Sequence, residues 1–385
     1  MKLVVFSHKL VWNNPESASG YATDGGFAFH MDAISQIFEQ TIVAVPVSSN
    51  RVAAGEVNIK GHNLMIFPLE NIKGHGLRRK MNYLLWLLKN ITIFNRLINE
   101  ADAVHTPIPS DIGTLGMIMA RIKGKPLFVR HCGNWNVQKT MAERFWKWFM
   151  ERYAGGINVM LATGLQEEQP SKKNENIKWI FSSSLAKAEI GFLASSVPSL
   201  SVKFPKLIIV CRMEEEKGVG RVILALDILR KDIPGLHLDI VGDGPALKSF
   251  QKSVTDLNLD DRVIFHGKLN HEGVLHIMQQ AHFFCYPTTA SEGFPKVVLE
   301  AMASGLPVLG TKVSAIKALI KNGGGILLEN ENPETLAAAI RQVLVHPEEY
   351  KAMQNAAMRT AGEFDLENWR DAIKTHLQRA WKIQN

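Results

Sequence analysis

Two glutamates enclose a short turn and an apolar run in residues 291–300, which read Ser-Glu-Gly-Phe-Pro-Lys-Val-Val-Leu-Glu. No obvious nucleophile or set of metal ligands lies beside Glu292 or Glu300. Carboxylates are poor partners for phosphate oxygens, but they accept strong hydrogen bonds from sugar hydroxyls. The pair therefore predicts contacts to two parts of one hydroxyl-rich ligand. For isolated glutamates, a solvated loop charge and an ordinary helix-surface residue are the alternatives.

The turn between the two glutamates also predicts an anion site. Pro295 suits the first turn of a helix over 295–303, because its missing N–H is one of the groups that stay unpaired there. The backbone N–H groups of Gly293, Phe294 and Lys296 would then be exposed at the positive end of the helix. The turn follows an expected strand, and parallel α/β sheets bind ligands at the carboxyl ends of their strands. A phosphate is therefore the expected occupant.

A doubly wound α/β domain is needed to position these residues. After Pro205, apolar runs typical of buried strands alternate with amphipathic stretches typical of helices. The expected strands are 207–210, 238–241, 263–265, 283–286, 308–310 and 326–328. The expected helices are 219–229, 246–257, 273–280, 295–303 and 333–344.

The first half of the chain repeats this scheme, with expected strands at 3–6, 41–46, 103–105 and 127–130. A chain of 385 residues is long enough for two domains. A Ser-rich stretch between the halves indicates a linker, and the spacing of Trp369, Leu377 and Trp381 indicates a last helix that packs back on the first domain. We therefore expect a Rossmann-like domain at 1–185, a linker at 186–203, a second Rossmann-like domain at 204–365 and a C-terminal helix at 366–385.

Three stretches of the second half carry a family resemblance. Residues 292–308 read Glu-Gly-Phe-Pro-Lys-Val-Val-Leu-Glu-Ala-Met-Ala-Ser-Gly-Leu-Pro-Val, residues 210–218 read Val-Cys-Arg-Met-Glu-Glu-Glu-Lys-Gly, and residues 240–245 read Ile-Val-Gly-Asp-Gly-Pro. They resemble the E-x7-E element, the Arg/Lys loop and the strand-end turn of the retaining family-4 glycosyltransferases, in that family's order along the chain. The resemblance implies the α/β GT-B fold, in which two Rossmann-like domains face each other across a cleft.

The resemblance also implies roles for individual residues. In the family, the positions matched by Arg212 and Lys217 bind the donor diphosphate and stabilise the leaving group, a role that suits two charged donors at one sheet edge. The position of Glu300 binds the ribose hydroxyls, and that of Glu292 contacts the transferred sugar. Gly242, in the strand-end turn, is assigned to the donor site with them. A surface Arg and Lys on a charged loop is the alternative.

Two elements of the first half resemble the family less closely. Gly25 and Gly26 precede a helix expected at 29–38 and resemble the Gly-rich loop at which backbone approaches donor phosphate and acceptor. A turn glycine pair is the alternative. His131 follows the strand 127–130, where the family has a histidine near the donor sugar, and a structural histidine is the alternative there.

We expect no metal and no cofactor, since the nucleotide sugar is the donor substrate. Nucleotide-sugar sites that use a divalent cation need closely spaced carboxylates after a strand, whereas Asp260 and Asp261 precede one. Arg212, Lys217 and the helix start would supply the positive charge instead. The family implies retention of the anomeric configuration, and the leaving diphosphate is the expected base toward the acceptor hydroxyl.

The net charge of +7 suits nucleic acid, an anionic membrane surface or phosphorylated small molecules. Residues 121–152 are basic, and residues 77–98 are basic and then apolar. The second pattern favours a helix that lies on a membrane and presents a lipid-linked acceptor, with a helix buried between domains as the alternative. The three distant cysteines suit a reducing compartment, and no apolar run is long enough to cross a bilayer. We therefore expect a cytoplasmic protein, with peripheral binding to the inner face of the plasma membrane as an option.

Together these features predict an enzyme, a retaining hexosyltransferase. It would move a sugar from a nucleotide-sugar donor to a glycan or lipid-linked acceptor during synthesis of a cell-surface polysaccharide such as lipopolysaccharide or capsule. A GT-B epimerase is one alternative, and a basic α/β module that binds nucleic acid is the other. No helix-turn-helix, RNA-recognition or zinc motif supports the second alternative, so no nucleic-acid partner is expected.

Overall fold

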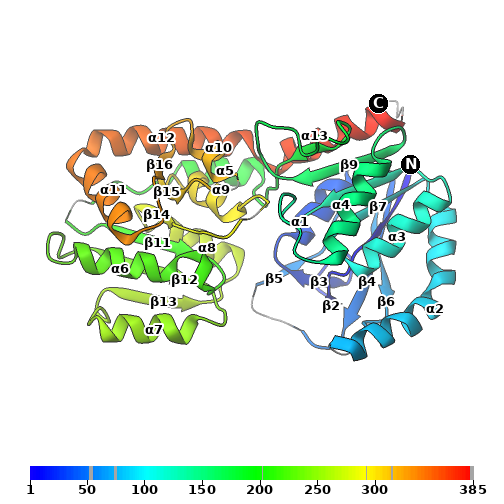
Figure 1. Ribbon diagram of the computed structural model, residues 1–385, viewed down its shortest axis with the longest axis horizontal. Helices are drawn as coiled ribbons and strands as arrows, with labels where there is room; N and C mark the ends of the chain where they lie inside the picture. The colour runs from blue at the N-terminus through cyan, green and yellow to red at the C-terminus, as the bar shows by residue number, and fades with distance from the viewer. Residues whose placement is uncertain (52–54, 73–75, 202, 292, 314, 382–385) are drawn as a thin grey trace. The chain divides into compact units, whose positions relative to one another are not determined.

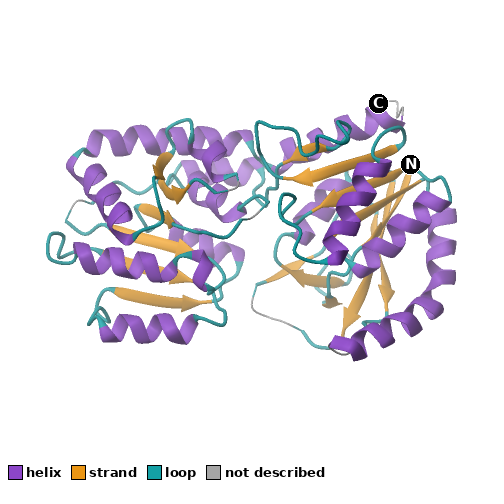
Figure 2. Cartoon of the chain, viewed as in Figure 1, coloured by secondary structure: helices purple, strands orange, loops and turns teal. Residues whose placement is uncertain are grey.

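The computed structural model describes residues 1–51, 55–72, 76–201, 203–291, 293–313 and 315–381. The chain forms two compact units, one of Met1–Phe181 with Trp369–Asn385 and one of Ser182–Asn368. Each unit combines a largely parallel sheet with covering helices (Figures 1 and 2). The chain therefore passes between the units twice, at 181–182 and at 368–369.

The sheet of the first unit has the strand order β10-β9-β8-β7-β1-β4-β2-β3-β5, and β6 pairs with β4 in addition. Its strands are β1 (Lys2–Phe6), β2 (Val11–Asn13), β3 (Tyr21–Asp24), β4 (Gln40–Ser48), β5 (Glu56–Asn58), β6 (Leu64–Leu69), β7 (Ala103–Ile108), β8 (Leu127–His131), β9 (Asn158–Thr163) and β10 (Lys178–Ile180). Strand β3 is antiparallel to β2 and β5, and the other pairs are parallel. The central strands are buried on both faces, as parallel sheets require.

The helices of the first unit are α1 (Phe27–Ser35), α2 (Gly76–Glu100), α3 (Asp111–Ile122), α4 (Met141–Tyr153) and, from Trp369 onward, α13 (Leu366–Trp381). Local signals set their starts: Ser110 accepts a hydrogen bond from the backbone of Gly113, and Thr140 and Glu143 form a capping box. No helix in the described part of the chain combines the length and apolar character needed to cross a membrane.

The C-terminal helix α13 packs on the first unit through two tryptophans. Trp369 is fully buried, its ring is stacked 4.5 Å from that of His30, and the guanidinium of Arg130 lies 5.0 Å above it. The indole N–H of Trp381 donates to the carbonyl of Ile157 at 2.8 Å. These contacts explain why the last residues belong to the same unit as the first.

The sheet of the second unit has the order β13-β12-β11-β14-β15-β16, with every adjacent pair parallel. Its strands are β11 (Lys206–Val210), β12 (His237–Val241), β13 (Val263–Gly267), β14 (Phe283–Tyr286), β15 (Val308–Thr311) and β16 (Gly325–Leu328). The chain runs outward from β11 to β13 and then returns to β14, beside β11. This reversal makes the carboxyl ends of β11 and β14 a topological switch point, where doubly wound sheets bind ligands.

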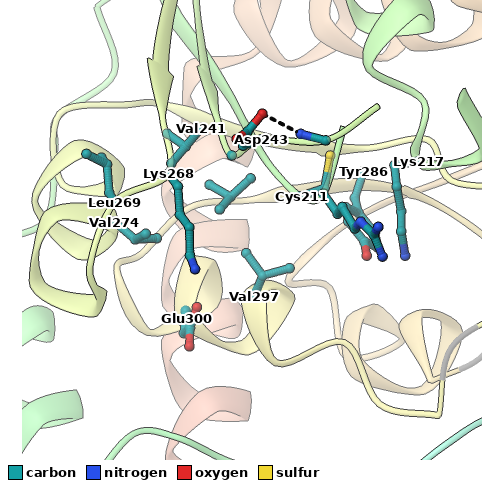
Figure 3. Close-up of a pocket in the computed structure, with 14 residues that line it drawn as sticks. Cys211, Lys217, Val241, Asp243, Lys268, Leu269, Val274, Tyr286, Val297 and Glu300 are labelled. Atoms are coloured by element: carbon teal, nitrogen blue, oxygen red, sulfur yellow. Dashed lines mark hydrogen bonds between the residues drawn. The ribbon is translucent and has the colours of Figure 1, made fainter. Parts of the chain in front are cut away.

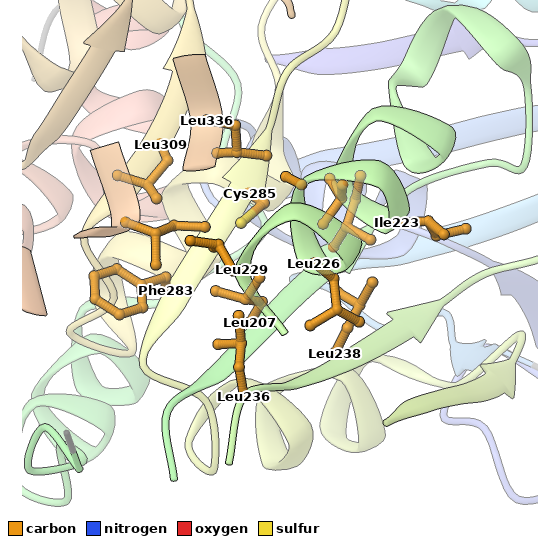
Figure 4. Close-up of a cluster of buried hydrophobic side chains, with 14 of the residues drawn as sticks. Leu207, Ile223, Leu226, Leu229, Leu236, Leu238, Phe283, Cys285, Leu309 and Leu336 are labelled. Atoms are coloured by element: carbon orange, nitrogen blue, oxygen red, sulfur yellow. The ribbon is translucent and has the colours of Figure 1, made fainter. Parts of the chain in front are cut away.

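The helices of the second unit are α5 (Lys187–Ala194), the 3-10 turn η1 (Glu215–Lys217), α6 (Val219–Leu229), α7 (Leu247–Asp256), α8 (His271–Met278), α9 (Lys296–Ala303), α10 (Ile316–Ile320), α11 (Pro333–Val345) and α12 (Pro347–Glu363). The core is formed where α6 and α11 meet the sheet, with Leu226 and Leu336 among the buried residues around Leu207 and Phe283 (Figure 4). Burying each such side chain contributes roughly 1.5–3 kcal/mol.

The strands expected from the sequence are confirmed in both halves, with ends that differ by no more than three residues. The expected helix 219–229 is α6, and the helix expected at 29–38 lies at 27–35 as α1. Helix α9 begins one residue later than expected, because Pro295 is its N-cap residue rather than its first helical residue. Residues 186–203, expected as a linker, contain helix α5 and lie inside the second unit.

Candidate functional site

A cavity of about 680 Å³ opens at the carboxyl ends of β11 to β14 in the second unit. Figure 3 shows that its lining comes from several strand ends and from α9. The lining residues are Val210, Cys211, Arg212, Lys217, Val241, Gly242, Asp243, Gly244, Lys268, Leu269, Val274, Tyr286, Val297 and Glu300. Four residues that the sequence assigned to a donor site, Arg212, Lys217, Gly242 and Glu300, therefore line one space.

Close backbone contacts join the loops around this cavity. Gly242 has a φ of +132°, and a Cβ atom there would lie 1.9 Å from the carbonyl oxygen of Cys211. Gly218 has a φ of +88°, and its Cβ would lie 2.4 Å from the carbonyl oxygen of Pro287. Only glycine fits at these two positions, because the conformation and the neighbouring backbone both exclude a side chain. The glycines thus bring the loops after β11, β12 and β14 into contact.

Three cations lie on the cavity lining. The Arg212 side chain is 69% exposed, and its Nε lies 3.2 Å from a carboxylate oxygen of Glu214. Lys217 immediately precedes Gly218 and helix α6, so it lies at the positive end of a helix. Lys268 follows β13 and points toward Glu300 (Figure 3). The sequence analysis missed Lys268, although its place directly after a parallel strand could have indicated it.

Glu300 presents a carboxylate to the same cavity from α9. Its side chain is 12% exposed, and its Oε1 accepts a hydrogen bond from Ser184 Oγ at 2.7 Å. Ser184 lies at the start of the second unit, in the Ser-rich stretch, and the sequence analysis gave it no role. The contact joins residues 116 positions apart, so no local pattern could have revealed it.

The described residues of the turn before α9 lie outside the cavity lining. Gly293 is partly buried, and the side chains of Phe294 and Pro295 are buried, with the Phe294 ring 6.0 Å from that of Phe364. Lys296 is the first residue of α9, and Val297, which follows it, lines the cavity. Among the described residues, those at 293–296 do not line the cavity, so their donor-binding role stays a prediction. Glu292 lies outside the described residues.

Gly25 and Gly26 form the turn between β3 and α1 in the first unit. Gly25 has a φ of +65°, with nothing within 4 Å of an added Cβ, and Gly26 is the N-cap residue of α1. The side chain of Asp24, just before them, forms an ion pair with Lys9. The turn thus places bare backbone at a helix start, as expected for a Gly-rich loop.

His131 ends strand β8 of the first unit and is 3% exposed. Its ring meets that of Trp135 edge-on at 5.3 Å, and its Nδ1 has no hydrogen-bond partner among the described residues. Burial lowers the pKa of His131 to about 4, so the ring is neutral at neutral pH. A neutral imidazole can accept or donate a hydrogen bond, but it brings no charge to a ligand.

The two units thus divide the predicted site residues. Arg212, Lys217, Gly242 and Glu300 share the cavity of the second unit, whereas Gly25, Gly26 and His131 belong to the first unit. Within the described ranges, no group of three or more His, Cys, Asp or Glu side chains is arranged to hold a metal ion. The cavity can bind an anion through its cations and a hydroxyl through Glu300.

A comparison with models of known protein families matches part of the second unit. Residues 195–360 match the family model described as "Glycosyl transferases group 1", and this range covers the three stretches that carried the resemblance. A GDP-mannose-dependent α-(1-6)-phosphatidylinositol monomannoside mannosyltransferase of Mycolicibacterium smegmatis is 29% identical over 173 residues, which are 43% of this chain and 44% of that protein. An α-D-kanosaminyltransferase of Streptomyces kanamyceticus is 26% identical over 306 residues, 74% of this chain and 78% of that protein. The match therefore spans less than half the length of the first relative.

A solved structure resembles the whole chain. HepE of Anabaena, crystallised with UDP and glucose, superposes with a TM-score of 0.69 at 18% identity and covers 98% of this chain and 99% of its own. At this identity the likeness shows the fold. The expected GT-B class, with two α/β domains built on parallel sheets, is confirmed.

Proposed function

We propose that this chain transfers a sugar from a nucleoside diphosphate sugar to a hydroxyl of a glycan or lipid-linked acceptor, because residues 195–360 match the family model of the group 1 glycosyl transferases. One observation carries the proposal: cations and a carboxylate line a single cavity at the switch point of the second unit. Diphosphate oxygens accept hydrogen bonds from Arg and Lys, and ribose or sugar hydroxyls donate to a carboxylate. A nucleoside diphosphate sugar offers both groups in one molecule.

The proposed chemistry follows from where charge develops. As the bond between the anomeric carbon and the diphosphate oxygen breaks, negative charge builds on the diphosphate, and Arg212 and Lys217 stabilise it. The acceptor oxygen bonds to the anomeric carbon, and its proton passes to the leaving diphosphate. Attack on the face that the diphosphate leaves retains the anomeric configuration. Contacts of Glu292 and His131 with the transferred sugar remain part of the proposal.

We expect the transfer to need no divalent cation. Arg212, Lys217 and Lys268 place three positive charges on one cavity lining, enough to oppose the charge of a diphosphate. The rate of sugar transfer should therefore be the same with EDTA as with Mg²⁺. Activity that disappears in EDTA and returns with Mg²⁺ would contradict this part of the proposal.

The first test is calorimetric titration of the chain with UDP, GDP and ADP and their sugar conjugates, in EDTA. The variants are Arg212→Ala and Glu300→Gln, and Arg359→Ala is the control because Arg359 is exposed on α12 and lines no part of the cavity. A lost charge-assisted hydrogen bond costs about 1.5–3 kcal/mol. The dissociation constant of the preferred nucleotide should therefore rise roughly 10- to 150-fold in the two variants and stay unchanged in the control.

Other outcomes separate the alternatives. Binding of duplex or single-stranded nucleic acid that falls steeply with salt and ignores Glu300→Gln would favour the nucleic-acid module. Interconversion of a sugar nucleotide without any acceptor would favour the epimerase. No binding of any nucleotide to the wild-type chain would refute the transferase proposal.

We further propose that the first unit binds an anionic phospholipid surface, at the inner face of the plasma membrane, where a lipid-linked acceptor for cell-surface polysaccharide would be presented. Exposed apolar side chains on α2 and α3 support this: the exposed fractions are 60% for Leu85, 71% for Leu88 and 78% for Ile122. Exposed Lys89 and Arg121 adjoin Leu88 and Ile122 in the chain. Apolar residues beside cations suit a bilayer interface with negative headgroups. The Mycolicibacterium smegmatis relative is named for a phosphatidylinositol-linked acceptor.

Vesicle sedimentation tests this surface. The chain should sediment with vesicles of phosphatidylglycerol and phosphatidylcholine but not with phosphatidylcholine alone, and added salt should weaken the binding. Leu88→Glu with Ile122→Glu should abolish sedimentation. Ile264→Glu, at a residue of the second unit that is 54% exposed, is the matched control and should have no effect. Equal sedimentation of all three proteins would refute the proposed surface.

A further inference from the structure

His271 lies between two carboxylates at the edge of the cavity in the second unit. It is the first residue of α8, whose start is set by the Asn270 side chain accepting from the backbone of Gly273 at 2.8 Å. Its Nε2 lies 3.1 Å from Glu189 Oε1, on α5, and its Nδ1 lies 3.7 Å from Glu300 Oε1, on α9. The ring thus connects the cavity carboxylate to a helix near the start of the second unit.

The geometry of the ring favours its charged form. A neutral imidazole has one N–H and one lone pair, so one nitrogen would turn a lone pair toward a carboxylate. The imidazolium has an N–H on each nitrogen: the one on Nε2 donates to Glu189, and the positive charge of the ring attracts Glu300, whose Oε1 lies 3.7 Å from Nδ1. Burial alone would lower the pKa of His271, and the Lys296 charge acts in the same direction. The hydrogen bond to Glu189 and the charges of Glu300 and Glu189 outweigh both, so the pKa is raised above its ordinary value.

The same contacts restrict the carboxylate of Glu300. Ser184 Oγ donates to Oε1 at 2.7 Å, and His271 Nδ1 approaches the same oxygen. Among the described residues, no hydrogen bond to the other oxygen, Oε2, is present. With Oε1 approached from two sides, Oε2 is the oxygen of Glu300 that is left for a ligand hydroxyl. A carboxylate that is held in this way loses little side-chain entropy when a ligand binds.

We infer that His271 is a positioning residue: as an imidazolium held by Glu189, it orients Glu300 for the hydroxyls of the nucleotide ligand. The inference rests on the proposed function, because it assigns that hydroxyl to the nucleotide. His271 acts through Glu300, so the loss of His271 should weaken nucleotide binding without stopping the chemical step. Glu189 is the second member of the arrangement and should act in the same direction as His271.

The sign of the pH dependence follows from the charge. A histidine whose pKa is raised by its partners makes its contribution below that pKa and loses it as the pH rises through it. Nucleotide affinity should therefore fall as the pH rises from 6.5 toward alkaline values. Phosphate groups of the nucleotide titrate near pH 6, but that change is common to the wild-type chain and every variant.

The experiment measures the dissociation constants of UDP and GDP between pH 6 and 9 for the wild-type chain, His271→Gln, Glu189→Gln and His276→Gln. His276 is the matched control, because it lies on the same helix α8 but is exposed, and its Nε2 lies 2.8 Å from Nε2 of Gln280. At pH 6.5 the first two variants should bind roughly 5- to 20-fold more weakly than wild type, and their only pH dependence should be that of the nucleotide phosphate. In turnover assays they should show a raised KM and a kcat within about twofold of wild type. His276→Gln should match wild type throughout.

A second measurement reports on the ring without any ligand. Long-range ¹H–¹⁵N spectra should show His271 titrating above 6.5 in the wild-type chain and lower in Glu189→Gln. A His271 that titrates at or below 6.5, or variants that bind like wild type, would overturn the inference and leave the proposed function intact. Absence of UDP and GDP binding to the wild-type chain would overturn both.

Discussion

Alanine in place of Gly242 should destabilise the second unit, because two independent penalties add. The backbone has a φ of +132°, and the new Cβ would lie 1.9 Å from the carbonyl oxygen of Cys211 and 3.0 Å from its carbonyl carbon. The clash is with backbone, so no rotamer change relieves it. The two loops cannot simply separate, since Gly242 donates to Gly267 at 2.8 Å and Cys211 donates to Val241 at 3.1 Å.

The magnitude follows from these contacts. Holding a residue with a side chain in this conformation costs about 1–3 kcal/mol, and overpacking adds about 1–3 kcal/mol. The total, about 2–6 kcal/mol, is a large part of a typical unfolding free energy. Gly191→Ala is the matched control: Gly191 is exposed on α5 with nothing within 4 Å of an added Cβ. Alanine in a helix is about 0.5–1 kcal/mol more favourable than glycine, so the control should be more stable than wild type.

Urea unfolding followed by two probes provides the assay. All eight tryptophans lie in the first unit, so their fluorescence follows that unit, whereas circular dichroism at 222 nm follows the helices of both. With a denaturant slope of about 2 kcal/mol per molar, Gly242→Ala should lower the midpoint of the second unit by about 1–3 M. The folded variant should also bind UDP and GDP weakly. A midpoint at or above that of wild type would refute the reasoning from the close contact.

Three further outcomes are expected. Lys268→Met should raise the dissociation constant for UDP or GDP at least several-fold and reduce its salt dependence, measured by calorimetry at two salt concentrations, because it removes a cation from the cavity lining. Burial lowers the pKa of His105 to about 3 and that of His131 to about 4, so between pH 6.5 and 4 the unfolded chain binds more protons than the folded chain. The unfolding free energy followed by tryptophan fluorescence should therefore fall by about 1.4 kcal/mol per histidine for each unit by which the pH is lowered in that range. A stability that is flat from pH 6.5 to 4.5 would contradict this, and His131→Asn should reduce the slope. Trp369→Ala should cost about 3–5 kcal/mol in the same unfolding assay, because the ring is fully buried, whereas Trp148→Ala, at a residue that is 52% exposed, should cost much less; equal losses would be evidence against the packing of α13.

The strands of the second unit were predictable because a parallel sheet buries both faces of each strand. Runs such as Leu207–Val210 therefore consist almost wholly of apolar residues, and this composition is visible without any tertiary information. Helix α6, at 219–229, was predictable for a related reason, because its buried residues recur at helical spacing. Short strands such as β2 and β5 gave no such signal, because three residues are too few to show a period.

The candidate site was predictable only where a residue lies in a local sequence pattern of its own. Arg212 and Lys217 share one loop, Gly242 follows a strand, and Glu300 lies in a stretch with a family resemblance, so each had a local pattern. Whether these four line one cavity depends on strand order, and the sheet order that puts β11 beside β14 is a property of the folded unit.

The sequence by itself determined the class of the fold, the family resemblance and the charged groups available for a diphosphate, because these depend on residue type and spacing. Tertiary structure decided which side chains meet: Lys268 at the cavity lining, Ser184 on Glu300, and His271 between Glu189 and Glu300. These contacts join residues from separate helices and loops, up to 116 positions apart in the case of Ser184 and Glu300. Such pairs leave no periodic trace in a single sequence, because burial and hydrogen-bond geometry select them only once the sheet has brought its strand ends together.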